Sequence, residues 1–454
     1  MTGAKRSAAG SILNRIRERE GLRKLVENVS WLFVERLVLL GLNFAVSVWF
    51  INYLGAAQYG KYAYAVSFAA LFGALASLGL DSIVVRDLAK SDVDPGEILG
   101  TAFLMRLVSS LLTFFLIAAT ILLVSDDATT RLLVVVVAAS VVADPAQVVD
   151  LWFQSRIQSK YVVWLRTGVA VASILTKIAL LVLRMPLIAF AWLYTAHALA
   201  LGLGFLVVFL RRKPGDLVLG RSVRRARKLL GDSWPLIVAG LSVTVYMRID
   251  RVMLGEMLGD HDVGTYSTAA TISEVWNFFP VAIASSLFPI VVRTKESADR
   301  QLYRKRMQAL YDVMALYGYG VALSMTVVGV WLIDLLFTRE FDESARILQI
   351  HIWSLLFVAL GVARTRYIVA ENRMRFSMMA TLTGGALNVL LNWILIPRFG
   401  GVGAALATLF SYSVAAYFSG LFVRDLWFTT GQMTRALLAP FRPRAVWREI
   451  RSIL

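Results

Sequence analysis

The chain of 454 residues contains no cysteine and only three histidines, and 17% of its residues are charged. The missing cysteine excludes disulfides, thiolate metal sites, a cysteine nucleophile and palmitoylation. His197, His261 and His351 are far apart, and the sequence has no H-E-x-x-H, P-loop or G-x-S-x-G motif. We therefore predict a protein that is not an enzyme and that holds no cofactor or metal. Any transport must then be driven by an ion gradient or the membrane potential, or by a separate partner protein.

Apolar residues make up 58% of the chain, and its mean hydropathy is +0.67. These values lie outside the range of ordinary soluble domains. About 20 apolar residues suffice for a helix to cross a bilayer, and twelve such runs are present: 31–54, 60–81, 98–124, 132–151, 161–183, 186–210, 234–254, 266–292, 307–337, 345–370, 376–396 and 402–423. Because these runs are continuously apolar and do not alternate, we predict an all-α integral membrane protein.

The net charge of +17 is distributed unevenly between alternate loops. If the N-terminus is cytoplasmic, the tails and inner loops hold 33 of the 47 Lys and Arg residues. The outer loops hold only Lys61, Arg131, Arg184, Arg339 and Arg398. The positive-inside rule therefore places both termini in the cytoplasm of a multi-pass protein of the cytoplasmic (inner) membrane. The charge predicts attraction to anionic membrane lipids and no nucleic-acid partner.

Two related halves are indicated by a repeat of the pattern L-G-x-x-x-x-G-x-Y. Leu54, Gly55, Gly60, Tyr62 and Ala65 recur 204 positions later as Leu258, Gly259, Gly264, Tyr266 and Ala269. Since each half holds six spans, the halves run in the same direction, as in transporters built from two bundles around a central site. We expect the glycines to form a tight outer turn that needs positive φ, and the tyrosines to anchor at headgroup depth.

The predicted organisation has five parts. Residues 1–30 form a basic amphipathic segment, 31–210 a first six-helix bundle, 211–233 a basic cytoplasmic linker, 234–423 a second six-helix bundle, and 424–454 a basic cytoplasmic C-terminal segment.

Charged residues inside the spans form two predicted layers, and each such residue is costly unless it has a partner or faces water. The inner layer contains Glu35, Arg36, Arg106, Asp144, Arg364 and Arg366. Its four arginines, drawn from both halves, would suit a diphosphate, because the guanidinium fork binds phosphate oxygens in pairs. The alternative is that they extend to the headgroups or pair with Glu35 and Asp144.

The outer layer contains Lys177, Arg248, Asp250, Arg251 and Glu274. Asp250 and Glu274 are expected at similar depth and could bind a coupling cation or proton, either H⁺ or Na⁺. The alternative is a fixed ion pair with Arg248 or Arg251. Lys177 has no acidic neighbour in its own helix, so it either faces water or is buried.

The chain resembles the Wzx-like polysaccharide flippases of the multidrug/oligosaccharidyl-lipid/polysaccharide exporter superfamily. The segments that carry the resemblance are WLFVERLVLLGLNFAVSVWFINYLGAAQYGKYAYAVSFAALF, LASLGLDSIVVRDLAK, YMRIDRVMLGEMLGDHDVGTYSTAATISEVWNFFPVAIASSLFP and GALNVLLNWILIPRFGGVGAALATLFSY. Together they cover nearly the whole chain in the family's order.

The resemblance implies a V-shaped pair of six-helix bundles and the transfer of a polyprenyl-diphosphate-linked oligosaccharide to the outer leaflet. It implies that Arg36, Arg248 and Arg251 are cavity cations, and that Glu35, Asp250 and Glu274 balance charge or couple transport. A polysaccharide polymerase or glycosyltransferase is an implied partner. The related lipid II flippases are expected to have two further spans, and nothing apolar enough follows Val423.

Three alternatives remain at this stage. A multidrug-and-toxin exporter shares the architecture, but it would carry cationic drugs, which an arginine-lined site repels. A membrane-embedded polymerase or glycosyltransferase would have larger loops bearing catalytic residues. A scaffold without transport would not need charged residues inside its spans.

Overall fold

A computed structural model describes residues 38–90, 94–156, 158, 160–212, 217–296, 299–371 and 373–450, and every regular element in these ranges is a helix. The chain divides into two compact units, residues 1–50 and 51–454. In the first unit, residues 38–50 are helical. The predicted segment 1–30 lies outside the described residues.

The N-terminal half of this unit begins with a helix over residues 51–71. The helices that follow are α2 Gly73–Ser77, α3 Asp81–Leu88, α4 Pro95–Val124, α5 Ala128–Ala138, the 3-10 helix η1 Ala139–Gln147, α6 Val148–Ser155, α7 Lys160–Val182 and α8 Leu187–Arg212. Asp94 and Asp127 start α4 and α5, because their side chains accept hydrogen bonds from the first free backbone N–H groups of the helix. Leu80, Ile98 and Trp152 are among the apolar side chains buried in the core of this half.

The C-terminal half follows the same plan. Its spans contain α9 Val223–Met257, α10 Asp260–Val275, α11 Phe278–Glu296, α12 Arg300–Leu336, the 3-10 turn η2 Arg339–Phe341, α13 Asp342–His351, α14 Ser354–Ala370 and α15 Met374–Ala416. The end of the chain adds η3 Phe418–Phe422, η4 Arg424–Leu426, α16 Trp427–Leu437, η5 Ala439–Phe441 and α17 Pro443–Ile450. Its core contains Met307, Tyr311 and Leu360.

Eight helices in the described part are long and apolar enough to cross a membrane, and a ninth results if Arg339–His351 and Ser354–Ile368, bent by 43°, are taken together. Two of the eight are longer than one crossing requires: Val38–Leu88 has 51 residues and Arg375–Phe422 has 48. Positive φ angles at Gly55 and Gly400 break both of them. The all-α membrane fold is therefore confirmed. With each broken helix counted as two crossings and the bent pair as one, the described part has eleven, and the predicted span 266–292, divided between α10 and α11, would be the twelfth.

The glycine turns of the repeat have the predicted backbone conformation. Gly55 has a φ of 72° and Gly259 a φ of 105°, which side chains with a Cβ rarely adopt. Gly400, in the turn inside α15, has a φ of 58° and makes the same kind of reversal. The prediction of a positive-φ turn is confirmed in both copies of the repeat.

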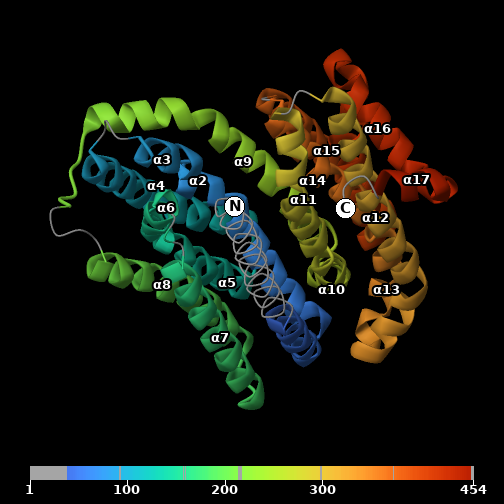
Figure 1. The fold of residues 1–454 in the computed structure, drawn as a ribbon. Coiled ribbons are helices and arrows are strands. Elements are labelled where there is room, and N and C mark those ends of the chain that lie inside the picture. The colour runs from blue at the N-terminus through green and yellow to red at the C-terminus, as the bar shows by residue number, and fades with distance from the viewer. Residues whose placement is uncertain are drawn as a thin grey trace, which may run out of the picture. The chain divides into compact units, whose positions relative to one another are not determined.

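Helix α9 begins inside the predicted linker and connects the two groups of helices (Figure 1). At its start it packs on the N-terminal half, where a Cβ on Gly79 would lie 2.9 Å from Leu236 Cβ. The preceding segment also packs there, since Gly220 N donates to Gly96 O at 3.1 Å. Farther along, α9 packs on α15. Residues 217–233 of the linker therefore pack on the N-terminal half, up to the beginning of the second bundle.

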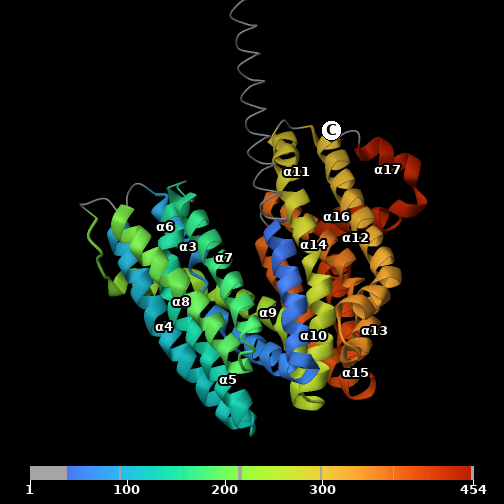
Figure 2. The ribbon, with the colours of Figure 1, turned by 90° about the horizontal axis from the view of Figure 1, so that it is seen from below.

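Figure 2 shows α16 and α17 at the same end of the molecule as the beginning of α12. The basic residues at the start of α12 and in the segment after Val423 therefore lie at this end, which the positive-inside rule makes cytoplasmic. The turns at Gly55, Gly259 and Gly400 lie at the opposite, outer end. This sidedness fixes the orientation of the site described below.

Candidate functional site

Arg106 lies inside the N-terminal half and is 0% exposed. Its guanidinium donates to Asp81 at 2.7 Å and lies 3.6 Å from Asp144. An arginine in this environment needs acidic partners, because an unpaired buried charge is destabilising. Arg106 therefore stabilises helix packing, and in this structure it cannot contact a diphosphate.

The two arginines of α14 are also held by neighbouring helices. Arg364 is buried and donates to Ala415 O at 2.5 Å and to Ser419 Oγ at 3.1 Å. Arg366 is partly exposed and donates to Ser285 Oγ at 3.1 Å. Glu35 and Arg36 lie outside the described residues. The inner arginines that the structure describes thus do not share one lining, because burial directs Arg106 and Arg364 to partners within their own half.

A polar cavity of about 490 Å³ lies within the membrane region of the N-terminal half. It is lined by residues of α2, η1, α7 and α8, and its polar members are Ser140, Asp144, Gln147, Arg166, Tyr194 and His197. Arg166 Nη2 donates to Asp150 Oδ2 at 2.6 Å, while half of the Arg166 side chain stays exposed. A guanidinium has five N–H donors, so this contact leaves donors for a ligand.

The sequence interpretation did not include Arg166, although it lies as deep in the span 161–183 as Arg36 does in the span 31–54. Lys177, on the same helix, is partly buried and does not line this cavity. Its distance along α7 from Arg166, eleven residues or about 16 Å, separates the two cations.

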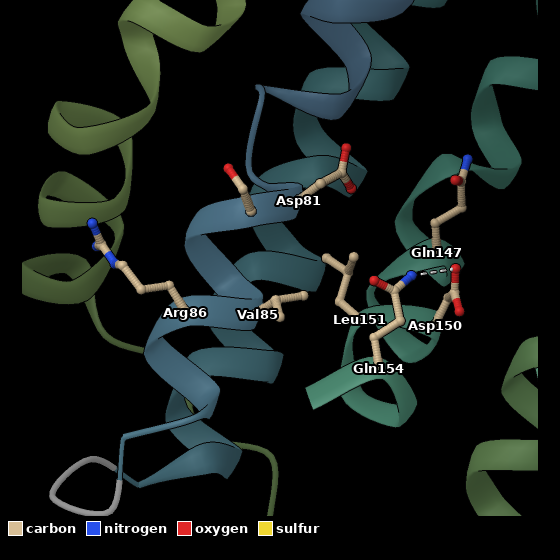
Figure 3. Close-up of a pocket in the computed structure, with 8 residues that line it drawn as sticks. Asp81, Val85, Arg86, Gln147, Asp150, Leu151 and Gln154 are labelled. Atoms are coloured by element: carbon tan, nitrogen blue, oxygen red, sulfur yellow. Dashed lines mark hydrogen bonds between the residues drawn. The ribbon is translucent and has the colours of Figure 1, made fainter. Parts of the chain in front are cut away.

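A second cavity, of about 600 Å³, lies between α3 and α6 on the cytoplasmic side (Figure 3). Asp81, Arg86 and Asp150 contribute its charges, and Gln154 donates to Asp150 at 3.0 Å. Gln147 lines this cavity and the first one. The two cavities therefore adjoin, and together they extend a polar surface from the cytoplasmic side into the membrane region.

Asp250 is the centre of a buried network in the C-terminal half. Its carboxylate accepts hydrogen bonds from Tyr266 at 2.7 Å, Thr408 at 2.6 Å and Asn392 at 2.5 Å. These donors come from α10 and α15, so one carboxylate on α9 joins three helices. The predicted place of Tyr266 at headgroup depth is wrong, because its hydroxyl satisfies a buried charge and only 2% of the residue is exposed.

Arg251 and Glu274 form a separate ion pair with 3.0 Å between Nη2 and Oε1. The outer acids were expected either to bind a coupling cation or to form a fixed ion pair. Glu274 forms the fixed ion pair, whereas the carboxylate of Asp250 accepts hydrogen bonds from uncharged donors. Arg248, one turn before Arg251 on α9, is partly exposed. It interacts electrostatically with Glu274 and with Tyr194, which lines the polar cavity of the other half. Arg248 is thus a cation of the outer layer that acts on a side chain in the wall of that cavity.

The two halves meet at the outer side through the second glycine of the repeat. A Cβ on Gly60 would lie 1.7 Å from Asp260 O, and a Cβ on Gly264 would lie 1.9 Å from Ala56 O. Residues 56 and 260 are themselves equivalent in the repeat, so the two contacts are related by symmetry. Small residues allow this backbone approach between membrane helices. The repeat therefore conserves a crossing point as well as a turn.

Polar contacts between the halves surround this crossing. Tyr64 donates to Glu256, the backbone N–H of Ala56 donates to Glu340 at 3.0 Å, and Lys61 Nζ lies 3.6 Å from Asp260 Oδ2. Lys61 also donates to Asp127 at 2.6 Å within its own half. The outer side is thus closed, whereas polar cavities lie on the cytoplasmic side.

We expect acidification of the outer medium to strengthen this closure. Burial raises the pKa of Asp260, and the nearby Lys61 only partly opposes the effect. In the closed arrangement, Asp260 therefore binds a proton more tightly than an exposed aspartate does. The stability that this proton gives to the closed arrangement is fully present below the ordinary pKa of 3.8, and it is lost as the pH rises through the raised pKa. Asp127 does not give this effect, because hydrogen bonds from Lys61 and then Thr130 hold its pKa below the ordinary value.

The measurement uses the absence of native cysteine. Spin labels on Asp126→Cys and His261→Cys, one on each half, report the outer separation. The short-distance population should grow as the pH falls, and adding Asp260→Asn should remove this dependence. A pH response that persists with Asp260→Asn would assign the effect to another group.

The sequence profile of the family described as "Polysaccharide biosynthesis protein" matches residues 25–295. The chain belongs to this family. A second profile, MatE, matches residues 235–394.

Among curated proteins, the chain is similar to the "Probable low-salt glycan biosynthesis flippase Agl15" of Haloferax volcanii, with 25% identity over 84% of this chain and 80% of that protein. It is also similar to the "Capsular polysaccharide biosynthesis protein CapF" of Staphylococcus aureus, with 23% identity over 40% of this chain and 46% of that protein. The relatives of this polysaccharide biosynthesis protein thus include a glycan flippase aligned over most of its length.

Solved structures share the fold. The lipid II flippase MurJ in an inward closed conformation aligns with a TM-score of 0.69 and 14% identity over 92% of this chain and 95% of that chain. An inward-facing multidrug resistance transporter of the MATE family aligns with a TM-score of 0.63 and 13% identity over 87% of this chain and 94% of that chain. At this identity the likeness establishes the all-helical fold of the chain.

Proposed function

We propose that this polysaccharide biosynthesis protein is a flippase that moves a polyprenyl-diphosphate-linked oligosaccharide from the cytoplasmic to the outer leaflet of the cytoplasmic membrane by alternating access. The observation that carries the proposal is the pair of adjoining cavities on the cytoplasmic side, lined in part by Arg166, below an outer side closed at Gly60 and Gly264. This arrangement suits loading from the cytoplasm. Family membership and the flippase relative support the choice of cargo.

In the proposed cycle, the diphosphate enters beside Arg166, with Arg248 as the next cation toward the outside. Arginine suits this task because its planar fork binds two phosphate oxygens at once. The prenyl chain stays in lipid, where it loses no apolar contact. Separation of the halves at Gly60 and Gly264, with closure of the cytoplasmic side, then exposes the sugar to the outside.

The direct test is reconstitution in liposomes with a fluorescent lipid-linked oligosaccharide and a membrane-impermeant quencher outside. Transfer that requires the protein supports the proposal, and export of a cationic drug without glycan transfer would favour the multidrug exporter.

Replacing Arg166 with Gln should reduce the initial rate of glycan transfer by about tenfold or more, because a charge-assisted phosphate contact contributes about 1.5–3 kcal/mol. The double variant R166Q/D150N removes the same cation without leaving Asp150 unpaired, so it should transfer glycan as slowly as the single variant. Arg131→Gln, in the first turns of α5 on the outer side, is the control. Normal transfer by R166Q/D150N at wild-type protein levels would exclude Arg166 as a diphosphate ligand.

We further propose that Asp250 couples transfer to an ion gradient, because its carboxylate links α9 to α10 and α15 and a cation or proton bound there would change those contacts. Replacing Asp250 with Asn should abolish the response of the transfer rate to an imposed Na⁺ or pH gradient. Asp334→Asn, an exposed acid near the outer end of α12, is the control. An Asp250→Asn protein that still responds to either gradient would place coupling elsewhere.

A further inference from the structure

The segment after the last span forms a pocket against the cytoplasmic end of α12. Helix α16 packs there through Tyr311 and Thr429, whose hydroxyls lie 2.6 Å apart. Gln432 Nε2 donates to Arg304 O at 2.7 Å, and Gln308 Nε2 donates to Gln432 O at 3.1 Å. The position of α16 on α12 is therefore fixed by hydrogen bonds as well as by apolar contacts.

The pocket between these helices has a volume of about 500 Å³. Three cations line it, Arg304 and Lys305 from α12 and Arg435 from α16, and no acidic side chain is among its lining residues. The Arg304 guanidinium lies 4.7 Å from the centre of the Phe428 ring, which orients it at the wall. The pocket is thus positively charged and partly preformed.

Two glutamine side chains that line this pocket are buried and incompletely hydrogen-bonded. Gln308 is 4% exposed and Gln432 is 6% exposed, and in both the Nε2 group is bonded to protein acceptors. Within the described residues, the Oε1 atoms of both have no hydrogen-bond partner. Buried carbonyl oxygens without a donor are unfavourable, so a bound molecule that donates a hydrogen bond to them would be stabilised.

The pocket lies at the depth of the inner membrane surface. Arg304 and Phe428 also line an adjoining cavity of about 440 Å³ together with Tyr367 and Glu371, where the span formed by α14 ends. At the rim, Trp427 is 57% exposed and its indole N–H donates to Leu421 O at 2.8 Å, beside Phe422, which is 87% exposed. Tryptophan and exposed apolar side chains at this level are typical of contact with lipid.

We propose that this pocket binds the headgroup of an anionic glycerophospholipid of the inner leaflet whose headgroup carries hydroxyls. The phosphate contacts Arg304, Lys305 and Arg435, a headgroup hydroxyl donates to the glutamine oxygens, and the acyl chains lie against Phe422 and Trp427. Basic pockets on the cytoplasmic side of membrane helices bind acidic lipids in this way. The site is separate from the transport cavities, so its occupancy does not depend on the proposed function.

The test measures binding of phosphatidylglycerol to the purified full-length protein in a zwitterionic detergent by native mass spectrometry. The variant K305Q/R435Q should raise the dissociation constant by roughly 30-fold, from the contribution of two basic groups near an anionic headgroup. The matched control R227Q/K228Q removes two exposed cations from the start of α9 on the same cytoplasmic side and should leave binding unchanged. Equal losses in both variants would show attraction to general surface charge and overturn the proposal.

A lipid series on the unaltered protein keeps the test independent of variant folding. Phosphatidylmethanol has the same charge as phosphatidylglycerol but no headgroup hydroxyl, and it should bind about fivefold more weakly for one lost hydrogen bond. Phosphatidylcholine should not compete. If soluble glycerol 3-phosphate displaced the lipid at a comparable concentration, the pocket would be a site for a free phosphate ester and not for a lipid. If all three lipids bound equally, the pocket would not recognise the headgroup.

Discussion

Replacing Gly60 with valine is expected to lower the rate of glycan transfer by at least tenfold while the protein still inserts into the membrane. The added Cβ would lie 1.7 Å from the backbone oxygen of Asp260, and a backbone atom cannot rotate away as the end of a side chain can. Overpacking of this kind costs about 1–3 kcal/mol, which changes an equilibrium by about 5- to 150-fold. The outer closed state loses this free energy, whereas a state with separated halves does not.

Two measurements check this expectation. Glycan transfer by the Gly60→Val protein is compared with transfer by Gly168→Val, since a Cβ at Gly168 meets no atom within 4 Å. Spin labels at Asp126→Cys and His261→Cys should report a larger outer separation in Gly60→Val only. Because Gly264 makes the symmetry-related contact, Gly264→Val should behave in the same way, and combining the two should add little. Wild-type transfer with an unchanged separation would show that the crossing point does not limit the cycle.

Joining the halves covalently at the outer side should stop transfer almost completely. Lys61 Nζ and Asp260 Oδ2 are 3.6 Å apart, so cysteines at these two positions are within reach of a short bis-thiosulfonate cross-linker. The cross-linked K61C/D260C protein should lose transfer because the halves can no longer separate, and a reducing agent should restore it. The chain has no native cysteine, so the wild-type protein needs no background substitution.

The matched control for cross-linking is K61C/D127C. Lys61 Nζ and Asp127 Oδ2 lie 2.6 Å apart within the N-terminal half, so the same reagent should link them without blocking separation of the halves. If cross-linked K61C/D260C still transferred glycan, the contacts between the halves at the outer side would persist throughout the cycle. The proposal that the halves separate at this side would then be wrong.

Composition and loop charge predicted the membrane class, its sidedness and its helical nature, because these depend on properties summed along the chain. The turns at Gly55 and Gly259 were predictable because only glycine adopts positive φ readily. The crossing at Gly60 was not, since the repeat shows that a glycine recurs and does not show which backbone approaches it.

The partners of intramembrane charges were harder to predict for a physical reason. In a soluble helix the buried face is the apolar one, but in lipid both the packed face and the exposed face are apolar, so periodicity does not tell which way Arg106 or Arg364 points. Tyr266 was misplaced for a related reason: tyrosine is equally suited to the headgroup region and to a buried carboxylate.

Helix α9 links the movement of the N-terminal half on the cytoplasmic side to the hydrogen bonds of Asp250 toward the outer side. From Leu236, which is held against Gly79, to Met257 it is a continuous helix of about 30 Å that bears Arg248, Asp250 and Arg251. Because such a helix is stiff, a tilt of the N-terminal half that moves Leu236 also moves Asp250 and strains the hydrogen bonds of its carboxylate. An ion bound at Asp250 that opposes this motion would therefore affect the position of Leu236, about four helical turns away, without any relay of side chains between them.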